Sequence, residues 1–366
     1  MRILISYRMR EYFEEPYGFK RELNKHLNKN HEITIVVDSG IAKRYIQNKF
    51  MGKHKCIIEV YKVREFLEKE INLRFDYIVA NPPYQINKKS LQSFRIWDEL
   101  SVKFIKLLKE GGELNIIHPG GWRFLTKQSR KESVDLLNLY KKYNIISMEL
   151  NDDKKGKETF GAGTDYDVIY MRKELNKGRT KVITSDETIT IDLRDYDIIP
   201  TSGIKIFNKL RAKDNDEKIE FLYSYSDYET RKSYISKVKD NEYKYPVLYT
   251  INDKQGDVFY YSNTKDKGHF GLSKIIIRQS AKRLIIDKEG LYGMTQFACA
   301  IVDKPENLEY ISKQIEKYFP ILSSLFTGVY TKNALTDNKG TMFKFIKEFK
   351  KEWYKDDILK SLKMTE

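Results

Sequence analysis

The sequence contains little cysteine and no long apolar run. Its only cysteines, Cys56 and Cys299, lie far apart, which excludes a disulfide framework and a cysteine-based metal site. A reducing, cytoplasmic location is therefore expected. The five histidines are scattered without the spacing of metal ligands, so no metal site is expected. No apolar run approaches the length of a membrane-spanning helix, and Ile3–Ile5 is too short for the core of a signal peptide.

Proline and glycine are also scarce, at 8 and 19 of 366 residues, while 40% of the chain is hydrophobic. This composition excludes a disordered or fibrous protein. Acidic residues are fewer than basic ones, at 52 against 67, which leaves a net charge of +15. Such an excess favours a polyanionic partner, most often nucleic acid, although a lysine-rich solvated surface is the simpler alternative.

Short apolar runs alternate with helical patterns over residues 1–173. The expected strands are Arg2–Ser6, Ile33–Val37, Cys56–Val60, Phe75–Ala80, Leu114–Ile117, Ile145–Leu150 and Asp167–Met171. A helix is expected over Phe94–Leu108, with Gly111 and Gly112 as its stop signal. This alternation predicts a parallel sheet with helices on both faces, in which ligands bind beyond the carboxyl ends of the strands.

The pattern changes after about residue 174. Strand-like runs follow at Thr188–Ile191, Val247–Ile251, Val258–Ser262, Lys274–Arg278, Leu284–Asp287 and Phe297–Val302. Two helices are expected near the end, one starting near Pro305 and one spanning Met342–Trp353. We therefore predict an α/β domain over residues 1–173, a linker over 174–203 and an α+β domain over 204–366.

The tetrapeptide Asn81-Pro82-Pro83-Tyr84 follows the apolar run Phe75–Ala80 and carries the clearest chemistry. Two prolines end the hydrogen-bond ladder of a strand and stiffen the turn after it. The turn can then aim the Asn81 side-chain oxygen and the Pro82 carbonyl at one NH2 group, and Tyr84 offers a face for a stacked base. A strand-terminating turn without chemistry is the alternative.

Arg74–Gln85, reading RFDYIVANPPYQ, resembles the catalytic motif of S-adenosylmethionine-dependent amino methyltransferases. The likeness is greatest to the adenine-specific DNA methyltransferases of restriction-modification systems. Leu107–Trp122 is similar to the family's next helix and strand, and Phe160–Met171 to its late motif. The resemblance covers most of residues 1–173. It implies a Rossmann-like methyltransferase sheet, catalysis by Asn81, Pro82, Pro83 and Tyr84, and stacking of a flipped adenine between Tyr84 and Phe160.

The same resemblance implies a binding site for S-adenosylmethionine at the strand ends. Asp38 matches the acidic residue that binds the cofactor ribose, although it could also cap a helix. Glu65 and Phe66 match the pair that contacts the cofactor adenine, although an ordinary helix start is the alternative. Ser6 and Tyr7 begin the first loop, which in this chain has no glycine before Gly18 and so departs from the family's glycine-rich pattern. Asn81 completes this set of expected cofactor contacts.

Basic and aromatic residues near two predicted strand ends are candidates for contact with nucleic acid. Those after the strand Leu114–Ile117 are Trp122, Arg123 and Lys127; those on the hairpin of the second domain are Lys274, Arg278, Lys282 and Arg283. They could contact phosphates, or enter a major groove from a β hairpin. A solvated surface explains them equally simply. The family likeness implies that the second domain recognises the target sequence.

The sequence thus predicts a site-specific DNA adenine N6-methyltransferase that acts on double-stranded DNA, with a restriction endonuclease or a partner subunit beside it and no membrane. Two alternatives stay open. The tetrapeptide also serves the methylation of RNA adenine or of a glutamine amide, and the unusual first loop would suit a weakened subunit that only recognises DNA. The target sequence and the oligomeric state are not predicted.

Overall fold

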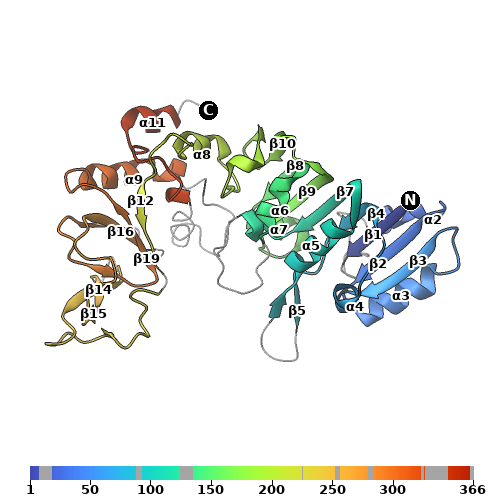
Figure 1. Cartoon of the computed structure of the whole chain (residues 1–366), viewed down its shortest axis with the longest axis horizontal. Helices are drawn as coiled ribbons and strands as arrows, with labels where there is room; N and C mark the ends of the chain where they lie inside the picture. Colours follow the sequence, from blue (N-terminus) through green and yellow to red (C-terminus); the bar gives the residue numbers. More distant parts are fainter. Residues whose placement is uncertain are drawn as a thin grey trace. The chain divides into compact units, whose positions relative to one another are not determined.

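The computed structural model describes residues 1–7, 19–87, 93–123, 135–224, 226–251, 256–278, 283–322, 325 and 345–362. The chain divides into two compact units, unit 1 (Met1–Ile199) and unit 2 (Pro200–Glu366) (Figure 1). No helix within these ranges is both long and apolar enough to cross a membrane.

Unit 1 is built on a nine-stranded sheet in the order β11-β10-β8-β9-β7-β4-β1-β2-β3. Its strands are β1 (Arg2–Tyr7), β2 (Glu32–Val37), β3 (Ile57–Lys62), β4 (Phe75–Ala80), β7 (Leu108–His118), β8 (Tyr143–Asn151), β9 (Tyr166–Leu175), β10 (Thr180–Ile183) and β11 (Thr188–Ile191). The run β3-β2-β1-β4-β7 is parallel and has the order of a Rossmann sheet. The predicted Rossmann-like α/β sheet is confirmed.

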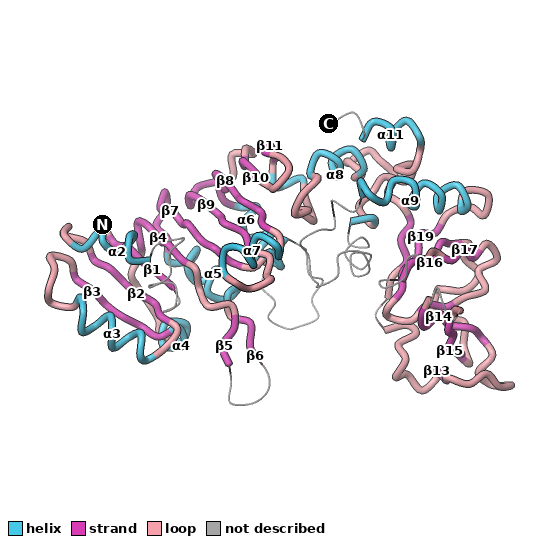
Figure 2. Tube along the Cα trace, turned by 180° about the vertical axis from the view of Figure 1, so that it is seen from behind, coloured by secondary structure: helices cyan, strands magenta, loops and turns pink. Residues whose placement is uncertain are grey.

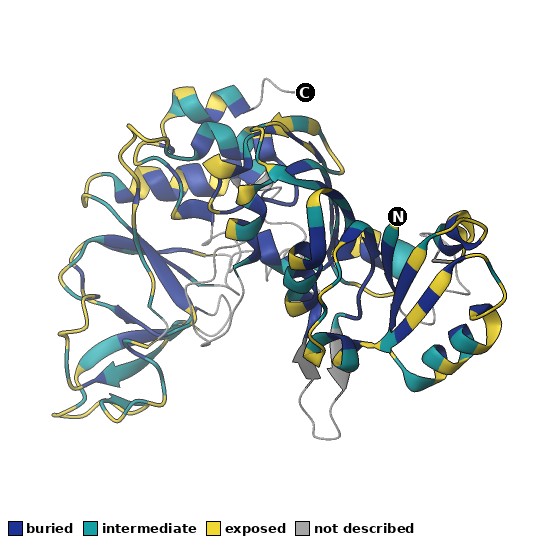
Figure 3. Cartoon of the chain, turned by 45° about the vertical axis from the view of Figure 1, so that its right-hand side comes forward, coloured by how far each residue is buried: buried dark blue, intermediate teal, exposed yellow. Residues whose placement is uncertain are grey.

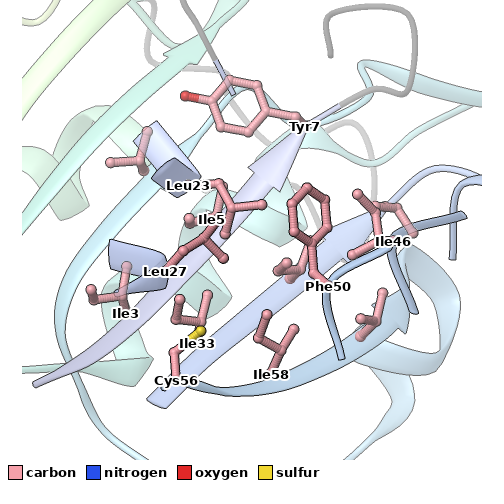
Figure 4. Packing of buried hydrophobic residues seen from close by; sticks show 14 of the residues in the cluster. Ile3, Ile5, Tyr7, Leu23, Leu27, Ile33, Ile46, Phe50, Cys56 and Ile58 are labelled. Carbon is pink, nitrogen blue, oxygen red and sulfur yellow. The ribbon is translucent and has the colours of Figure 1, made fainter. Parts of the chain in front are cut away.

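Helices cover both faces of this sheet. They are α2 (Phe19–Leu27), α3 (Gly40–Phe50), α4 (Val63–Glu68), α5 (Trp97–Leu107), α6 (Leu136–Lys142) and α7 (Asp153–Phe160). Apolar residues of α2 and α3 pack on one face of β1, β2 and β3 in a single buried cluster that includes Ile5, Ile33 and Phe50 (Figure 4). On the opposite face α4 contacts α5 through the rings of Phe66 and Phe104. β3, at the end of the sheet, alternates buried and exposed positions (Figure 3).

Three predictions for unit 1 need correction. The sheet is mixed, because β9 runs antiparallel to both β7 and β8. Much of the predicted linker 174–203 belongs to this sheet as β10 and β11, since β10 pairs with β8. Gly111 and Gly112 do not cap the helix: α5 ends at Leu107, and both glycines lie in β7, close to a register shift against β4.

Unit 2 contains two four-stranded sheets with helices, ordered β12-β19-β16-β17 and β13-β15-β14-β18. Its strands are β12 (Glu220–Leu222), β13 (Ile235–Ser236), β14 (Tyr245–Thr250), β15 (Val258–Ser262), β16 (Lys274–Arg278), β17 (Ile285–Asp287), β18 (Gly293–Met294) and β19 (Ala298–Val302). Its helices include α8 (Ile204–Leu210), α9 (Leu308–Leu322) and α11 (Asp356–Lys360). β16 and β17 form the expected antiparallel hairpin.

The helix predicted over Met342–Trp353 is wrong for its described part. Only Phe345 and Ile346 are helical there, and Phe349 forms an isolated bridge with Arg211. Apolar residues at helical spacing still pack together, because Phe345 and Phe349 both meet the ring of Phe207. Met342 lies outside the described residues.

Candidate active site

The polar residues of interest gather at the carboxyl edge of the sheet in unit 1. The parallel strands end in register there: Ser6 of β1 lies opposite Ala80 of β4, and Tyr7 lies opposite Val37 of β2. The strand order reverses between β1 and β4, since β2 follows β1 on one side and β7 follows β4 on the other. Ligands of open α/β sheets bind at such a reversal.

Asn81 is the first residue beyond β4 and is only 2% exposed. Its backbone N–H donates to the carbonyl of Ser6 at 2.7 Å, which ties the turn to the end of β1. Its side-chain Oδ1 is buried and has no hydrogen-bond partner among the described residues, and the same holds for the hydroxyl of Ser6. An unpaired buried polar atom costs about 1–3 kcal/mol, so two of them at the strand reversal favour a site for a polar ligand.

The residues after Asn81 leave the sheet in a stiff turn. Pro82 and Pro83 are buried and have no N–H, so neither can donate to the Asn81 oxygen. Tyr84 is half-buried and leads into a separate two-stranded hairpin of β5 (Gln85–Asn87) and β6 (Ser93–Arg95) (Figure 2). The turn therefore holds Asn81 and Tyr84 between the main sheet and this hairpin.

The ends of β1 and β2 offer further polar groups. Asp38 follows β2 and is exposed. The N-cap of α3 is Ser39, whose hydroxyl accepts from the N–H of Ala42 at 3.2 Å, so Asp38 is not needed as the helix cap. Tyr7 instead belongs to the core cluster on β1, as Figure 4 shows.

Glu65 and Phe66 make contacts within α4 and the core, and the burial of Phe66 contradicts its predicted role. The Glu65 carboxylate accepts from the N–H of Lys62 at 2.9 Å, which caps α4, and from Lys43 Nζ at 2.8 Å. The hydrogen bond from Lys43 is the main reason why the pKa of Glu65 falls to about 2. The Phe66 side chain is fully buried against Phe104, so it cannot lie on a cofactor ring. The contacts of Glu65 are those of an ordinary helix start, although 39% of its side chain stays exposed.

Trp122 and Arg123 are buried, so their side chains are not accessible to the phosphates of a nucleic acid. Trp122 Nε1 donates to Asp167 Oδ2 at 2.6 Å. Arg123 Nε lies 3.1 Å from the same oxygen, and Arg123 Nη2 lies 3.2 Å from Asp165 Oδ2. The predicted contacts of Trp122 and Arg123 with nucleic acid are therefore wrong, because these side chains pair with Asp165 and Asp167. We call Trp122, Arg123, Asp165 and Asp167 the Arg123 cluster. Lys127 lies outside the described residues.

The Arg123 cluster holds two carboxylates against one guanidinium. Burial raises the pKa of Asp167 to about 7, Arg123 opposes this rise, and Asp165 adds to it. The folded protein thus binds a proton here that the unfolded chain releases near its usual carboxyl pKa of 3.8. We predict that the free energy of unfolding falls as the pH rises from about 4 to 7. The Asp167→Asn variant should lose this slope in urea unfolding at a series of pH values; equal slopes would contradict the assignment.

Phe160 ends α7 and is half-buried. Its ring packs edge-on against Tyr166 of β9 at 4.9 Å, and Thr159 Oγ1 lies within 3.1 Å of the Tyr166 hydroxyl. Because β9 is antiparallel to β7, Tyr166 starts at the same edge of the sheet where β7 ends: Asp167 lies opposite His118. Phe160 thus belongs to the edge that carries Asn81, with β7 between β4 and β9.

The loop after Phe160 packs tightly on α7 at a glycine. A Cβ at Gly156 would lie 1.9 Å from the backbone oxygen of Thr164, whereas a Cβ at Gly163 would meet nothing within 4 Å. The Gly156→Ala variant should therefore lose about 1–3 kcal/mol of stability in thermal unfolding. Gly163→Ala is the matched control and should unfold like the wild type. Equal stability of both variants would exclude the close packing.

Three of the cations predicted on the hairpin of unit 2 are described, and each contacts another group of the protein. Lys274 is fully buried, and its Nζ pairs with Asp287 Oδ2 at 2.7 Å, so a contact with nucleic acid is wrong for this residue. Arg278 is half-buried and donates through Nε to the carbonyl of Tyr249 at 2.8 Å. Arg283 is exposed and pairs with Asp257. Lys282 lies outside the described residues.

Sequence reasoning missed the acids of the Arg123 cluster. Asp165 and Asp167 flank Tyr166, directly before the apolar run Val168–Met171. Charged residues beside such a buried run need partners, and this need could have indicated the cluster from the sequence.

Within the ranges that the structure describes, no group of His, Cys, Asp or Glu side chains could hold a metal ion.

No protein-family model and no curated protein matches this chain. Solved structures resemble part of it. A proposed class I S-adenosylmethionine-dependent methyltransferase from Listeria monocytogenes is 10% identical over 50% of this chain and 58% of its own, with a TM-score of 0.33. The modification subunit of a proposed type I restriction enzyme from Vibrio vulnificus is 13% identical over 52% and 44%, with a TM-score of 0.34.

The M protein of the type I restriction enzyme EcoKI is 9% identical over 58% of this chain and 55% of its own, with a TM-score of 0.31. The matched part is less than two thirds of each of these three chains. These similarities assign no reaction to this chain, and a reaction has to be inferred from its own residues.

Proposed function

We propose that this chain is an S-adenosylmethionine-dependent methyltransferase that modifies the amino group of adenine in DNA. One observation carries the proposal. Asn81 Oδ1 is a buried acceptor without a partner among the described residues, it lies at the strand reversal, and two prolines follow it. An acceptor in this setting suits a ligand N–H group.

The chemistry of adenine explains why such acceptors matter. The lone pair of its amino nitrogen is delocalised into the ring, so the nitrogen is a poor nucleophile. Asn81 Oδ1 and the Pro82 carbonyl accept the two amino hydrogens, which localises the lone pair on nitrogen without a strong base. Tyr84 stacks on the base from one side and Phe160 from the other.

The ends of β1 and β2 fit the cofactor in part. The buried hydroxyl of Ser6, which has no partner in the described part of the chain, and the exposed carboxylate of Asp38 can bind its polar groups. S-adenosylmethionine would supply an electrophilic methyl group there. The rings of Phe66 and Tyr7 are buried in the core, so neither is a candidate contact for the cofactor, whereas the partly exposed Glu65 carboxylate stays one.

The net charge of +15 supports a nucleic-acid substrate. The adenine amino group is paired inside a duplex, so the base must be flipped out before Asn81 can reach it. Unit 2 is our candidate for reading the target sequence, and a restriction endonuclease or another subunit is the expected partner. RNA adenine and a protein glutamine amide are the alternative substrates.

The test is a transfer assay with methyl-labelled S-adenosylmethionine and unmethylated duplex DNA. Label is expected in N6-methyladenine of DNA. Label only in RNA or only in protein would show that the substrate is RNA or protein and not DNA. No transfer, together with no binding of S-adenosylmethionine in titration calorimetry with or without DNA, would instead favour a subunit that only recognises DNA.

A further inference from the structure

The Arg123 cluster joins two segments that lie far apart in the sequence, both at the edge of the sheet that carries Asn81. Trp122 and Arg123 belong to η1 (Gly120–Arg123), the turn directly after β7. Asp165 directly precedes β9 and Asp167 is its second residue, and all four side chains are at least nine-tenths buried. The cluster therefore fixes the start of β9 against the turn that follows β7.

The structure makes room for this cluster at a glycine. A Cβ on Gly120 would lie 2.1 Å from Arg123 Nη2 and 2.4 Å from Asp165 Oδ2. The turn thus closes directly over the guanidinium. Arg123 uses its planar fork to reach both carboxylates, which a lysine ammonium cannot do in the same way.

Tyr166 connects this cluster with Phe160. Successive side chains of a strand point to opposite faces, so Asp167 faces Arg123 while Tyr166 faces away from it. The Tyr166 ring is fully buried, packs edge-on against Phe160 and shares a hydrogen bond with Thr159. A shift of the start of β9 would therefore move the ring on which Phe160 rests.

We propose that Arg123 is a positioning residue that sets Phe160 for its contact with the target base. This rests on the proposed function, and it replaces the predicted contact of Arg123 with phosphate. Arg123 acts through Asp167, Tyr166 and Phe160 and does not touch the substrate. Its loss should therefore affect the flipped base and leave the cofactor site on the β1 and β2 side of Asn81 as it is.

The experiment compares wild type and Arg123→Lys on a duplex whose methylated position has been mapped with the wild-type protein. We expect kcat to fall about 10- to 100-fold, because small misplacements of substrate-contacting groups have effects of this size. The fluorescence increase of 2-aminopurine at the mapped position should fall in parallel. Affinity for S-adenosylmethionine, measured by titration calorimetry, should not change.

Arg172→Lys is the matched control. Arg172 pairs with Glu113 at 2.6 Å and joins the same two strands, β9 and β7, farther from the edge that carries Asn81. This variant should keep kcat and the fluorescence signal of the wild type. Asp165→Asn, which removes only one partner of Arg123, serves as the second variant if Arg123→Lys fails to fold, and it should show a smaller loss of the same kind.

A double-mutant cycle with Phe160→Ala tests whether Arg123 acts through Phe160. If it does, Arg123→Lys should cause little further loss of kcat or fluorescence once Phe160 has been replaced. Additive losses, or a normal signal in Arg123→Lys, would overturn the positioning role and leave the proposed function intact. A wild-type protein that methylates no adenine would overturn both.

Discussion

Replacing Asn81 by alanine is expected to lower methyl transfer to adenine about 100- to 1000-fold, the range found when one preorganised hydrogen-bonding group is removed from a catalytic site. The fold should survive, because the backbone N–H of Asn81 still donates to Ser6. The variant should unfold at the same temperature as the wild type or a higher one, since the lost oxygen is buried without a partner among the described residues. The labelled-methyl assay and a thermal melt measure the two effects.

Asn144→Ala provides the opposite pattern as a control. Asn144 is also buried, but its Nδ2 donates to Glu174 at 2.8 Å near the start of β8. Its loss should lower stability by about 1 kcal/mol and leave methyl transfer unchanged. An Asn81→Ala variant that is as active as the wild type would refute the proposed chemistry. A variant that is inactive and also unfolded would show that Asn81 supports the fold.

Replacing Lys274 by methionine is expected to destabilise unit 2 by about 3–5 kcal/mol, because removal of one partner leaves a buried charge unpaired. Lys274 and Asp287 are both buried, and Asp287 also accepts from the N–H groups of Leu291 and Tyr292. Hydrogen exchange of the β16 and β17 amides reports the loss. Because the exchange is measured at amides of unit 2, it reports the stability of this unit even where unit 1 unfolds separately.

Lys288→Met is the control on the same hairpin. Lys288 follows β17 and pairs with Glu309 at 2.6 Å, with both side chains about half exposed. Its loss should change stability by less than about 0.5 kcal/mol. If Lys274 contacted DNA phosphates instead, Lys274→Met would reduce the salt dependence of DNA binding by about one phosphate and leave hydrogen exchange unchanged. That result would show that Lys274 lies on the surface and contacts nucleic acid, as the sequence predicted.

The sequence predicted strands and turns correctly where they depend on neighbouring residues. The run Phe75–Ala80 is rich in apolar residues, and β4 has these bounds. Asn81 directly follows it, because the next two residues are prolines that cannot continue a ladder. The strands Val258–Ser262 and Lys274–Arg278 are likewise as predicted. Apolar periodicity and proline act within a few residues, so they can be interpreted without the rest of the chain.

Direction and pairing were harder to predict. The run Asp167–Met171 is a strand, but its apolar pattern is the same whether it runs parallel or antiparallel to β7. Thr188–Ile191 is also a strand, yet only its pairing with β10 assigns it to the first sheet and not to the predicted linker. Neither property is encoded in the residues of the strand itself.

By itself, the sequence determined most strands of the sheet, the turn at Asn81 and the basic character of the chain, because these depend on residue types and short-range spacing. Only the tertiary structure decided which charged side chains are available to a ligand. Arg123 meets Asp165, Lys274 meets Asp287 and Glu65 meets Lys43, each across a separation that no local pattern indicates. A charge is removed from the surface when a distant acid or base is folded against it, and the same folding leaves the Asn81 oxygen buried beside the end of β1.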